Sequence, residues 1–347
     1  CQKLIDEIGV DIIVGPLSGD EGVAVREFAR EHPERVFLNG AAGSQQIYNP
    51  APNFFSFSPN GVQFIAGLGT HCYEQGYRRI VTLSEAYSYT FAQIGGFALE
   101  FCKAGGEIVE ILWCGLGTEN YTPFIEQIPD DVDAVCSVLG GTDSVRFVQQ
   151  YREARGNIPI IGGTLQGDAT SLHFSKDYAD LLEGMLTASP VCDDAPDDNW
   201  RAFVQTYTEL YADDGFYSPS LIAFGYYMNL KSLLMALAEI DGNLDDGQEK
   251  LKQTLLSLEF DGLTGRVKLD RHHFPVIDNF VNKVAVKPDG TLYTTMVKRI
   301  EKIDSTLGYT DEEWLAMGKF DMSNIPCGRF TGKRETFADI IKRTKKS

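Results

Sequence analysis

Short apolar runs alternate with longer amphipathic stretches over the first half of the chain. The runs predict strands over 10–14, 35–39, 79–83, 107–113, 133–138 and 159–162. The stretches between them predict helices over 20–31, 62–76, 87–104, 122–128 and 143–155. Strands that alternate with helices of roughly 10–15 residues are typical of a parallel sheet covered on both faces. The pattern therefore predicts an α/β fold.

The pattern changes after about residue 188. Three helices are expected, over 199–212, 218–240 and 246–258. The segment 261–300 then alternates apolar and polar residues between glycine-containing turns, which predicts β-hairpins. From 303 onward the chain is polar and interrupted by Pro and Gly, so we expect a tail over 303–347 that wraps the surface and ends in a solvated basic run, 342–346.

Small and polar residues follow five of the predicted strands. They occupy 18–19, 41–44, 84–89, 140–143 and 163–168. Ligands of open α/β sheets bind outside the carboxyl ends of the strands. Glycine lets a ligand approach backbone N–H groups, and hydroxyls orient it. Any one such turn also fits ordinary turn geometry, but their recurrence in phase indicates a ligand site.

Signatures of catalysis are missing from the sequence. It contains no G-x-S-x-G elbow, no phosphate-binding P-loop and no H-E-x-x-H pair. The adjacent His272 and His273 would point to opposite faces of a strand, so they cannot chelate one metal ion together. We therefore expect a protein that binds a small molecule without chemistry, with no catalytic residue, cofactor or metal.

Length and charge restrict the partners further. A chain of 347 residues is expected to form two domains. The net charge of −18 repels phosphate backbones and anionic lipids, which argues against nucleic acid as a partner. We identify no apolar run that approaches the roughly 20 residues of a membrane span, so no membrane insertion is expected.

The cysteines and the start of the chain give two further expectations. Seven cysteines at positions 1, 72, 102, 114, 136, 192 and 327 form no C-x-x-C pair, and we expect buried free thiols. Leu4, Ile5 and Ile8 share one face of an amphipathic helix. Because a parallel α/β unit normally opens on a strand, we expect a further strand–helix–strand segment upstream of this sequence.

Six motifs in order carry a family resemblance. They are G-P-L-S-G at 15–19, L-N-G-A-A-G-S at 38–44, F-S-F-S-P-N at 55–60, E-A-Y-S-Y at 85–89, L-G-G-T-D at 139–143 and G-L-T-G-R-V-K-L-D at 262–270. In this order the chain resembles the type I periplasmic solute-binding proteins over roughly residues 1–300. More narrowly, it resembles the branched-chain amino-acid-binding (Leu/Ile/Val-binding) family of ABC importers.

The resemblance implies a two-lobed architecture. Two doubly wound parallel-sheet lobes would be joined by three crossover segments near 57–61, 187–191 and 272–279. Lobe one would comprise 1–59 plus 190–273, and lobe two 60–189 plus 276–300. The resemblance further implies a periplasmic protein, with its secretory signal outside this sequence. It would bind a small-molecule solute between the lobes and deliver it to the membrane permease and ATPase subunits of an importer.

The resemblance also implies roles for individual residues. Ser18 and Gly19 match the turn that meets the solute carboxylate, and Ala41, Ala42, Gly43 and Ser44 match a backbone-plus-hydroxyl site. Tyr89 matches an aromatic residue that closes on the solute, and Thr142 a residue that lines the pocket. Thr164, or Leu165 beside it, matches the place where amino-acid binders keep an acid for the ammonium group.

The identity of the solute depends on where this sequence departs from the family pattern. Thr164 and Leu165 are uncharged, although Asp143 and Asp168 lie nearby in sequence. An ammonium group in a dry cleft needs a carboxylate or several acceptors. Tyr87, with Tyr89 and Phe91, offers an apolar wall, unless Phe91 belongs to the core. We therefore favour an aromatic acid, or another acid or amide without an ammonium group, over a branched-chain amino acid.

Two further interpretations concern charge and function. Asp20 and Glu21 would repel an anionic solute, and their expected role is to stabilise the N-terminus of the helix that follows. A ligand sensor on the same fold is the alternative function. A doubly wound enzyme would need a catalytic constellation that the sequence does not supply.

Overall fold

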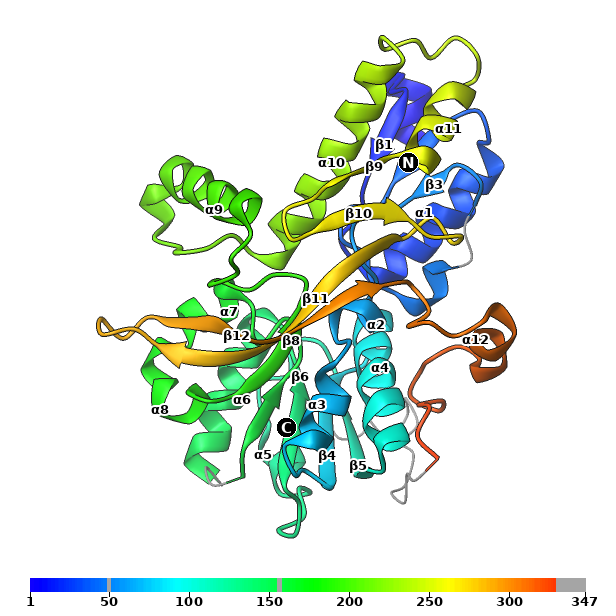
Figure 1. Ribbon diagram of the computed structural model, residues 1–347. Helices are drawn as coiled ribbons and strands as arrows, with labels where there is room; N and C mark the ends of the chain where they lie inside the picture. The colour runs from blue at the N-terminus through cyan, green and yellow to red at the C-terminus, as the bar shows by residue number, and fades with distance from the viewer. Residues whose placement is uncertain (49–50, 155–157, 329–347) are drawn as a thin grey trace.

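The computed structural model describes residues 1–48, 51–154 and 158–328, so the basic run 342–346 lies outside the described residues. The described chain forms an upper and a lower group of elements, connected by two long strands that cross the middle of the molecule (Figure 1). The α/β fold expected from the sequence is confirmed.

The upper group contains a parallel sheet of order β1-β2-β3. Its elements are β1 (Ile12–Val14), α1 (Gly19–Glu31), β2 (Val36–Leu38), β3 (Phe54–Phe55), α9 (Asp198–Leu210), α10 (Leu221–Glu239) and α11 (Glu249–Ser257), with the short helices Leu4–Ile8, Gln45–Tyr48 and Ala212–Asp214. Strand β2 shows why helices cover both faces. Phe37 packs with residues of α1, whereas Val36 and Leu38 pack with residues of α10 and α11, because successive side chains of a strand alternate.

The lower group contains five parallel strands in the order β5-β4-β6-β7-β8. These are β4 (Arg79–Glu85), β5 (Glu107–Cys114), β6 (Ala134–Val138), β7 (Ile160–Gly162) and β8 (Leu186–Ser189). Their helices are α2 (Gly61–Phe64), α3 (Leu68–Glu74), α4 (Ser88–Ala104), α5 (Thr122–Ile125), α6 (Gly141–Ala154), α7 (Ala169–Phe174), α8 (Ala179–Leu182) and the short turn Lys176–Tyr178. Ile80 of β4 packs with α4, whereas Val81 and Leu83 pack with residues of α5 and α6.

The predicted hairpins are confirmed as antiparallel strands. They are β9 (Glu259–Asp261), β10 (Arg266–Leu269), β11 (Pro275–Val286) and β12 (Leu292–Ile303), followed by α12 (Asp311–Met317). Strand β11 pairs with β8 of the lower group, with β10 and with β12. One sheet therefore continues from the lower group into the upper one. The lobe limits 1–59 plus 190–273 and 60–189 plus 276–300 stay a prediction.

The helix expected over 62–76 is wrong as a single helix. It is divided into α2 and α3, and Gly67 between them has a φ of 88°. The carboxylate of Glu100 accepts the N–H groups of Gly67 at 2.8 Å and of Gly69 at 3.2 Å. A contact from α4 thus fixes the N-terminus of α3. Helices α7, α8 and α12 were also not expected from the sequence.

The expectation about apolar length needs correction. Helix α10 is long and apolar enough, by length and composition alone, to cross a membrane. In this structure it is a helix of the upper core, where Phe224, Met228 and Ala236 are buried against other elements. At the start of the chain, Leu4 and Ile8 are exposed, and Ile5 packs against the core beneath α1.

Two of the cysteines are not free thiols. Cys102 at the end of α4 forms a disulfide with Cys327, 225 residues further along the chain. Cys72, Cys114, Cys136 and Cys192 are buried free thiols, as expected, whereas Cys1 is exposed. The expectation of free thiols is therefore wrong for Cys102 and Cys327.

Candidate functional site

Three of the predicted solute-binding segments meet at one place. Strand β1 ends at Val14, and α1 begins at Gly19 in the turn that follows it. A Cβ atom placed on Gly19 would lie 2.6 Å from the Ser88 hydroxyl oxygen, 3.1 Å from the Ser44 nitrogen and 3.2 Å from the Tyr89 nitrogen. The absence of a side chain at Gly19 therefore lets the N-termini of α1 and α4 and the loop after β2 come together.

The loop after β2 offers fewer free backbone N–H groups to a solute than the sequence indicated. The N–H of Ala41 donates to the carbonyl of Pro16 at 3.0 Å, and the N–H of Ala42 donates to Asn39 Oδ1 at 3.1 Å. Both donors are therefore used within the protein. Gly43 and Ser44 form the part of the loop that faces α4. A Cβ atom on Gly43 would lie 2.6 Å from the Tyr89 ring.

Tyr89 and Thr164 are joined through a residue that the sequence did not single out. Gln93, one turn after Tyr89 on α4, donates to the Tyr89 hydroxyl at 2.8 Å and to Thr164 Oγ1 at 2.7 Å. Its carbonyl oxygen accepts the N–H of Thr164 at 3.1 Å. All three residues are buried, so the amide holds the start of α4 against the loop after β7.

The hydroxyl of Ser88 is a second feature that sequence reasoning missed. Ser88 is 4% exposed and is the first residue of α4. Among the residues that the structure describes, its oxygen has no hydrogen-bond partner. A buried polar atom without a partner costs free energy and calls for an explanation. A serine at a helix start is usually a cap, so the sequence alone gave no reason to select it.

Other predicted residues lie at the edge of this place or away from it. Ser18 is the N-cap residue of α1, and its side chain makes no capping bond. Tyr87 is half-buried, and its ring stacks on Tyr89 with centroids 6.2 Å apart. Phe91 packs in the core against Trp113. Thr142 is exposed and lines a surface hollow of about 460 Å³ between α6 and α7.

The two aspartates named as possible ammonium partners already accept backbone N–H groups. The Asp143 carboxylate accepts the backbone N–H of Gly117 at 2.7 Å and a guanidinium N–H of Arg146 at 3.3 Å. Asp168 accepts from Thr170 at 3.0 Å and from Leu221, the first residue of α10, at 2.7 Å. Burial raises the pKa of Asp168 to about 6.

Glu85, at the end of β4, is a buried carboxyl group beside Asp143. Burial, and then the charge of Asp143, raise its pKa to about 8, although the Gly140 N–H opposes the shift. The group is therefore largely protonated at pH 7. A neutral carboxylic acid is a weak partner for an ammonium group.

This shift predicts a pH-dependent stability. The ordinary pKa of 4.5 applies to Glu85 in the unfolded chain, so between pH 4.5 and about 8 the folded protein binds more protons than the unfolded chain. The contribution of Glu85 to the free energy of unfolding should therefore fall as pH rises through this window, by at most about 1.4 kcal/mol per pH unit. Denaturant unfolding of the wild type and Glu85→Gln at pH 5, 6.5 and 8 measures it. The free energy of unfolding of Glu85→Gln minus that of the wild type should increase with pH. A difference that stays constant with pH, as expected for the exposed Glu126→Gln control, would contradict this prediction.

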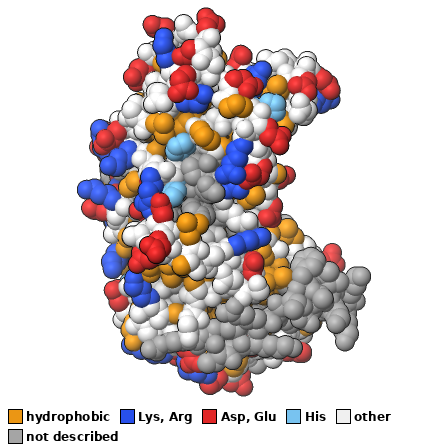
Figure 2. Space-filling model, turned by 90° about the vertical axis from the view of Figure 1, so that its right-hand side faces the viewer, with side chains coloured by type: hydrophobic (Ala, Val, Ile, Leu, Met, Phe, Trp, Pro, Cys, Tyr) orange, Lys and Arg blue, Asp and Glu red, His pale blue; other side chains and the backbone are white. Residues whose placement is uncertain are grey.

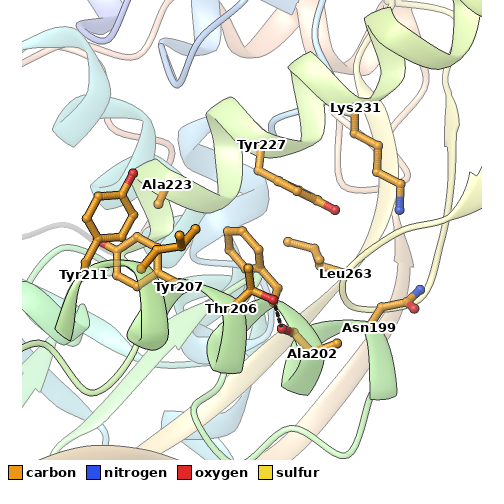
Figure 3. Close-up of a pocket in the computed structure, with 11 residues that line it drawn as sticks. Asn199, Ala202, Thr206, Tyr207, Tyr211, Ala223, Tyr227, Lys231 and Leu263 are labelled. Carbon is orange, nitrogen blue, oxygen red and sulfur yellow. Dashed lines mark hydrogen bonds between the residues drawn. The ribbon is translucent and has the colours of Figure 1, made fainter.

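A second hollow shows a different composition. It has a volume of about 510 Å³ and lies between α9 and α10, where Phe203, Tyr207 and Tyr227 form its wall and Lys231 lies at one end (Figure 3). It shares no residue with the predicted site. Among the described residues, no group of three or more His, Cys, Asp and Glu side chains is placed to hold a metal ion.

Comparison with known proteins relates this geometry to a family. The family model described as periplasmic binding protein matches residues 1–285. A curated relative, Leu/Ile/Val-binding protein homolog 6 from Brucella melitensis, is 22% identical over 311 residues, which cover 87% of this chain and 77% of the relative.

Solved structures share the fold. An ABC transporter substrate-binding protein from Sphaerobacter thermophilus has a TM-score of 0.79 and 27% identity, with 88% of this chain and 83% of the other covered. A solute-binding protein of an ABC transporter from Rhodopseudomonas palustris BisB5, in complex with 3,4-dihydroxybenzoic acid, has a TM-score of 0.79 and 23% identity, with 88% and 82% covered. The family match over residues 1–285, which agrees with the motifs and the fold, shows that this chain belongs to the periplasmic binding protein family.

Proposed function

We propose that this protein binds a small carboxylate solute where α1, α4 and the loop after β2 meet, and releases it unchanged to the permease and ATPase of an importer. The observation that carries the proposal is the buried, unpartnered hydroxyl of Ser88 beside Gly19. The N-termini of α1 and α4 both face this place, and helix N-termini favour anions. A carboxylate oxygen would accept the hydrogen bond that Ser88 does not otherwise make.

The groups around Ser88 favour a solute without an ammonium group. Asp143 and Asp168 already accept backbone N–H groups, and Glu85 is largely neutral at pH 7. The stacked rings of Tyr87 and Tyr89 match a planar, apolar body. The two relatives suggest different solute classes, since one is bound to dihydroxybenzoic acid and the other is named for leucine, isoleucine and valine. The contacts on this chain favour an aromatic acid.

The disulfide supports a periplasmic location for this chain. Disulfides persist in oxidising compartments such as the bacterial periplasm and are rare in the cytosol. The Cys102–Cys327 bridge is thus consistent with the compartment of the family to which the chain belongs.

A thermal-shift screen tests the proposal. Benzoate and 4-hydroxybenzoate are expected to raise the melting temperature, because a ligand that binds only the folded state stabilises it. Leucine, isoleucine and valine should raise it less. Strong stabilisation by leucine with none by either aromatic acid would overturn the solute class and assign the ammonium group to one of the aspartates.

Ser88→Ala tests the residue that carries the proposal. Loss of one buried hydrogen bond costs on the order of 1–3 kcal/mol, so affinity for the aromatic acid should fall roughly 5- to 150-fold. The solute-free variant should be as stable as the wild type, since the hydroxyl has no partner to lose. Ser257→Ala on the exposed part of α11 is the control. Equal affinities of Ser88→Ala and the wild type would contradict the proposed site.

A further inference from the structure

The chain after β12 runs along both groups of elements on one side of the molecule. We call residues 304–327 the tail segment; it contains α12 and ends at the disulfide cysteine. In Figure 1 it descends on the right beside α2 and α4, and Figure 2 looks onto this face, where basic and acidic side chains lie next to one another. The tail segment is therefore placed to contact both sides of the proposed solute site.

Gln45 connects the tail segment to the loop that carries Gly43 and Ser44. Its side-chain carbonyl accepts the N–H of Phe320 at 3.2 Å, and its amide donates to the carbonyl of Gly318 at 3.2 Å. Gln45 is 3% exposed and directly follows Ser44. The two bonds therefore connect this loop directly to the tail segment.

The same stretch of the tail segment is held against α4. The ring of Phe320 lies so close to Gly95 that a Cβ atom there would overlap it, and the ring packs with Trp314, Val62 and Ala92. Seven residues after Phe320, Cys327 is bonded to Cys102 at the end of α4. The tail segment thus contacts both α4, which carries Ser88, and the loop that carries Ser44.

A third set of contacts fixes the tail segment to the turn before β11. Asp311, at the start of α12, accepts hydrogen bonds from Arg271 Nε at 2.7 Å and lies 2.9 Å from His272 Nε2. The Arg271 guanidinium also donates to the carbonyl of Tyr309 at 3.2 Å. These contacts hold the tail segment at a point far in sequence from both Gln45 and α4.

We infer that Gln45 is a positioning residue for solute binding, and that the tail segment, through Gln45 and Phe320, sets the spacing between Ser44 and Ser88. The inference rests on the proposed function, because it concerns groups proposed to meet the solute carboxylate. Neither Gln45 nor Phe320 touches the solute. They keep donors in place before it arrives, which lowers the cost of ordering them on binding.

Hydrogen exchange without solute tests the positioning directly. The N–H of Gln46 donates to Ser44 Oγ at 3.3 Å, and the N–H of Ile47 donates to the Ser44 carbonyl at 3.2 Å, so these two amides report on the loop. Gln45→Ala should raise their exchange roughly tenfold, as expected for the loss of one or two net hydrogen bonds. Gln45→Glu keeps the acceptor for the Phe320 N–H but turns an oxygen toward the Gly318 carbonyl, so it should raise exchange at least as much as Gln45→Ala.

Phe320→Ala is an independent test of the positioning, because it leaves the sequence of the loop unchanged. It should raise exchange at the same two amides, whereas Leu315→Ala, on the exposed side of α12, should not. Unchanged exchange in both Gln45→Ala and Phe320→Ala would overturn the inference. Because this readout needs no solute, it tests whether the tail segment positions the loop even if the proposed function fails.

Benzoate affinity then separates positioning from a purely structural role. Gln45→Ala and Gln45→Glu should each weaken benzoate binding roughly tenfold, at temperatures where each variant is fully folded. Faster exchange with an unchanged benzoate affinity would overturn the role in solute binding. If the wild type binds none of the acids, the proposed function fails separately and the exchange result still stands on its own.

Discussion

Gly19→Ala is expected to weaken solute binding roughly tenfold to a hundredfold. The new Cβ would lie 2.6 Å from the Ser88 hydroxyl and within 3.2 Å of the backbone nitrogens of Ser44 and Tyr89. The serine side chain can rotate away, but the two backbone atoms belong to the loop after β2 and to α4. Relief of such contacts costs about 1–3 kcal/mol, and it would separate the surfaces that hold the solute.

Calorimetric titration of Gly19→Ala with the best aromatic acid measures this effect. Gly328→Ala is the control, because a Cβ atom there meets no neighbour within 4 Å and the backbone needs no unusual φ. In the solute-free variant the free energy of unfolding should fall by at most about 1–3 kcal/mol, because the same contacts exist without solute, and the better helix propensity of alanine offsets part of the cost. Wild-type affinity in Gly19→Ala would show that the solute does not require this close approach.

Gln93→Leu is expected to destabilise the protein by roughly 2–4 kcal/mol and to weaken solute binding roughly tenfold. The substitution removes the buried partner of the Tyr89 hydroxyl, the Thr164 hydroxyl and the Thr164 N–H. Buried polar groups left without partners each cost about 1–3 kcal/mol. Affinity should fall because Tyr89, which closes over Gly43, is no longer held at the start of α4.

Urea unfolding and calorimetric titration together test this second effect. Gln205→Leu is the matched control, because Gln205 makes one exposed hydrogen bond, to Glu209 on the same helix. A loss of stability without any loss of affinity would show that Gln93 stabilises the fold but has no role in solute binding. If Gln93→Leu lost neither stability nor affinity, the hydrogen bonds of Gln93 would not hold the site.

Much of the fold followed from local patterns. The strands of the lower group were predictable because the faces of β4 are both buried, which requires a continuous apolar run such as Ile80–Leu83. The turns after β1 and β2 were recognisable because small residues stand at the ends of apolar runs. The break at Gly67 was not, since it depends on a carboxylate 33 residues away, on another helix.

The groups that hold the candidate site depend on contacts over long sequence distances. Gln93 meets Thr164 across 71 residues, and Gln45 meets Phe320 across 275. No periodicity or spacing connects such pairs. Thr142 was assigned by the resemblance, whereas its place on the first turn of α6 leaves it exposed. The roles of Ser18, Gly19, Gly43, Ser44, Tyr87, Tyr89 and Thr164 stay predictions that the proposed experiments test.

The most direct test of the central claim is a calorimetric titration of the wild type with benzoate and 4-hydroxybenzoate, with the solute recovered afterwards and examined by NMR. The account predicts saturable binding of at least one of these acids, at one solute per chain, and recovery of the solute unchanged. Conversion of the solute to a product, or heat of binding only with leucine, isoleucine or valine, would contradict it.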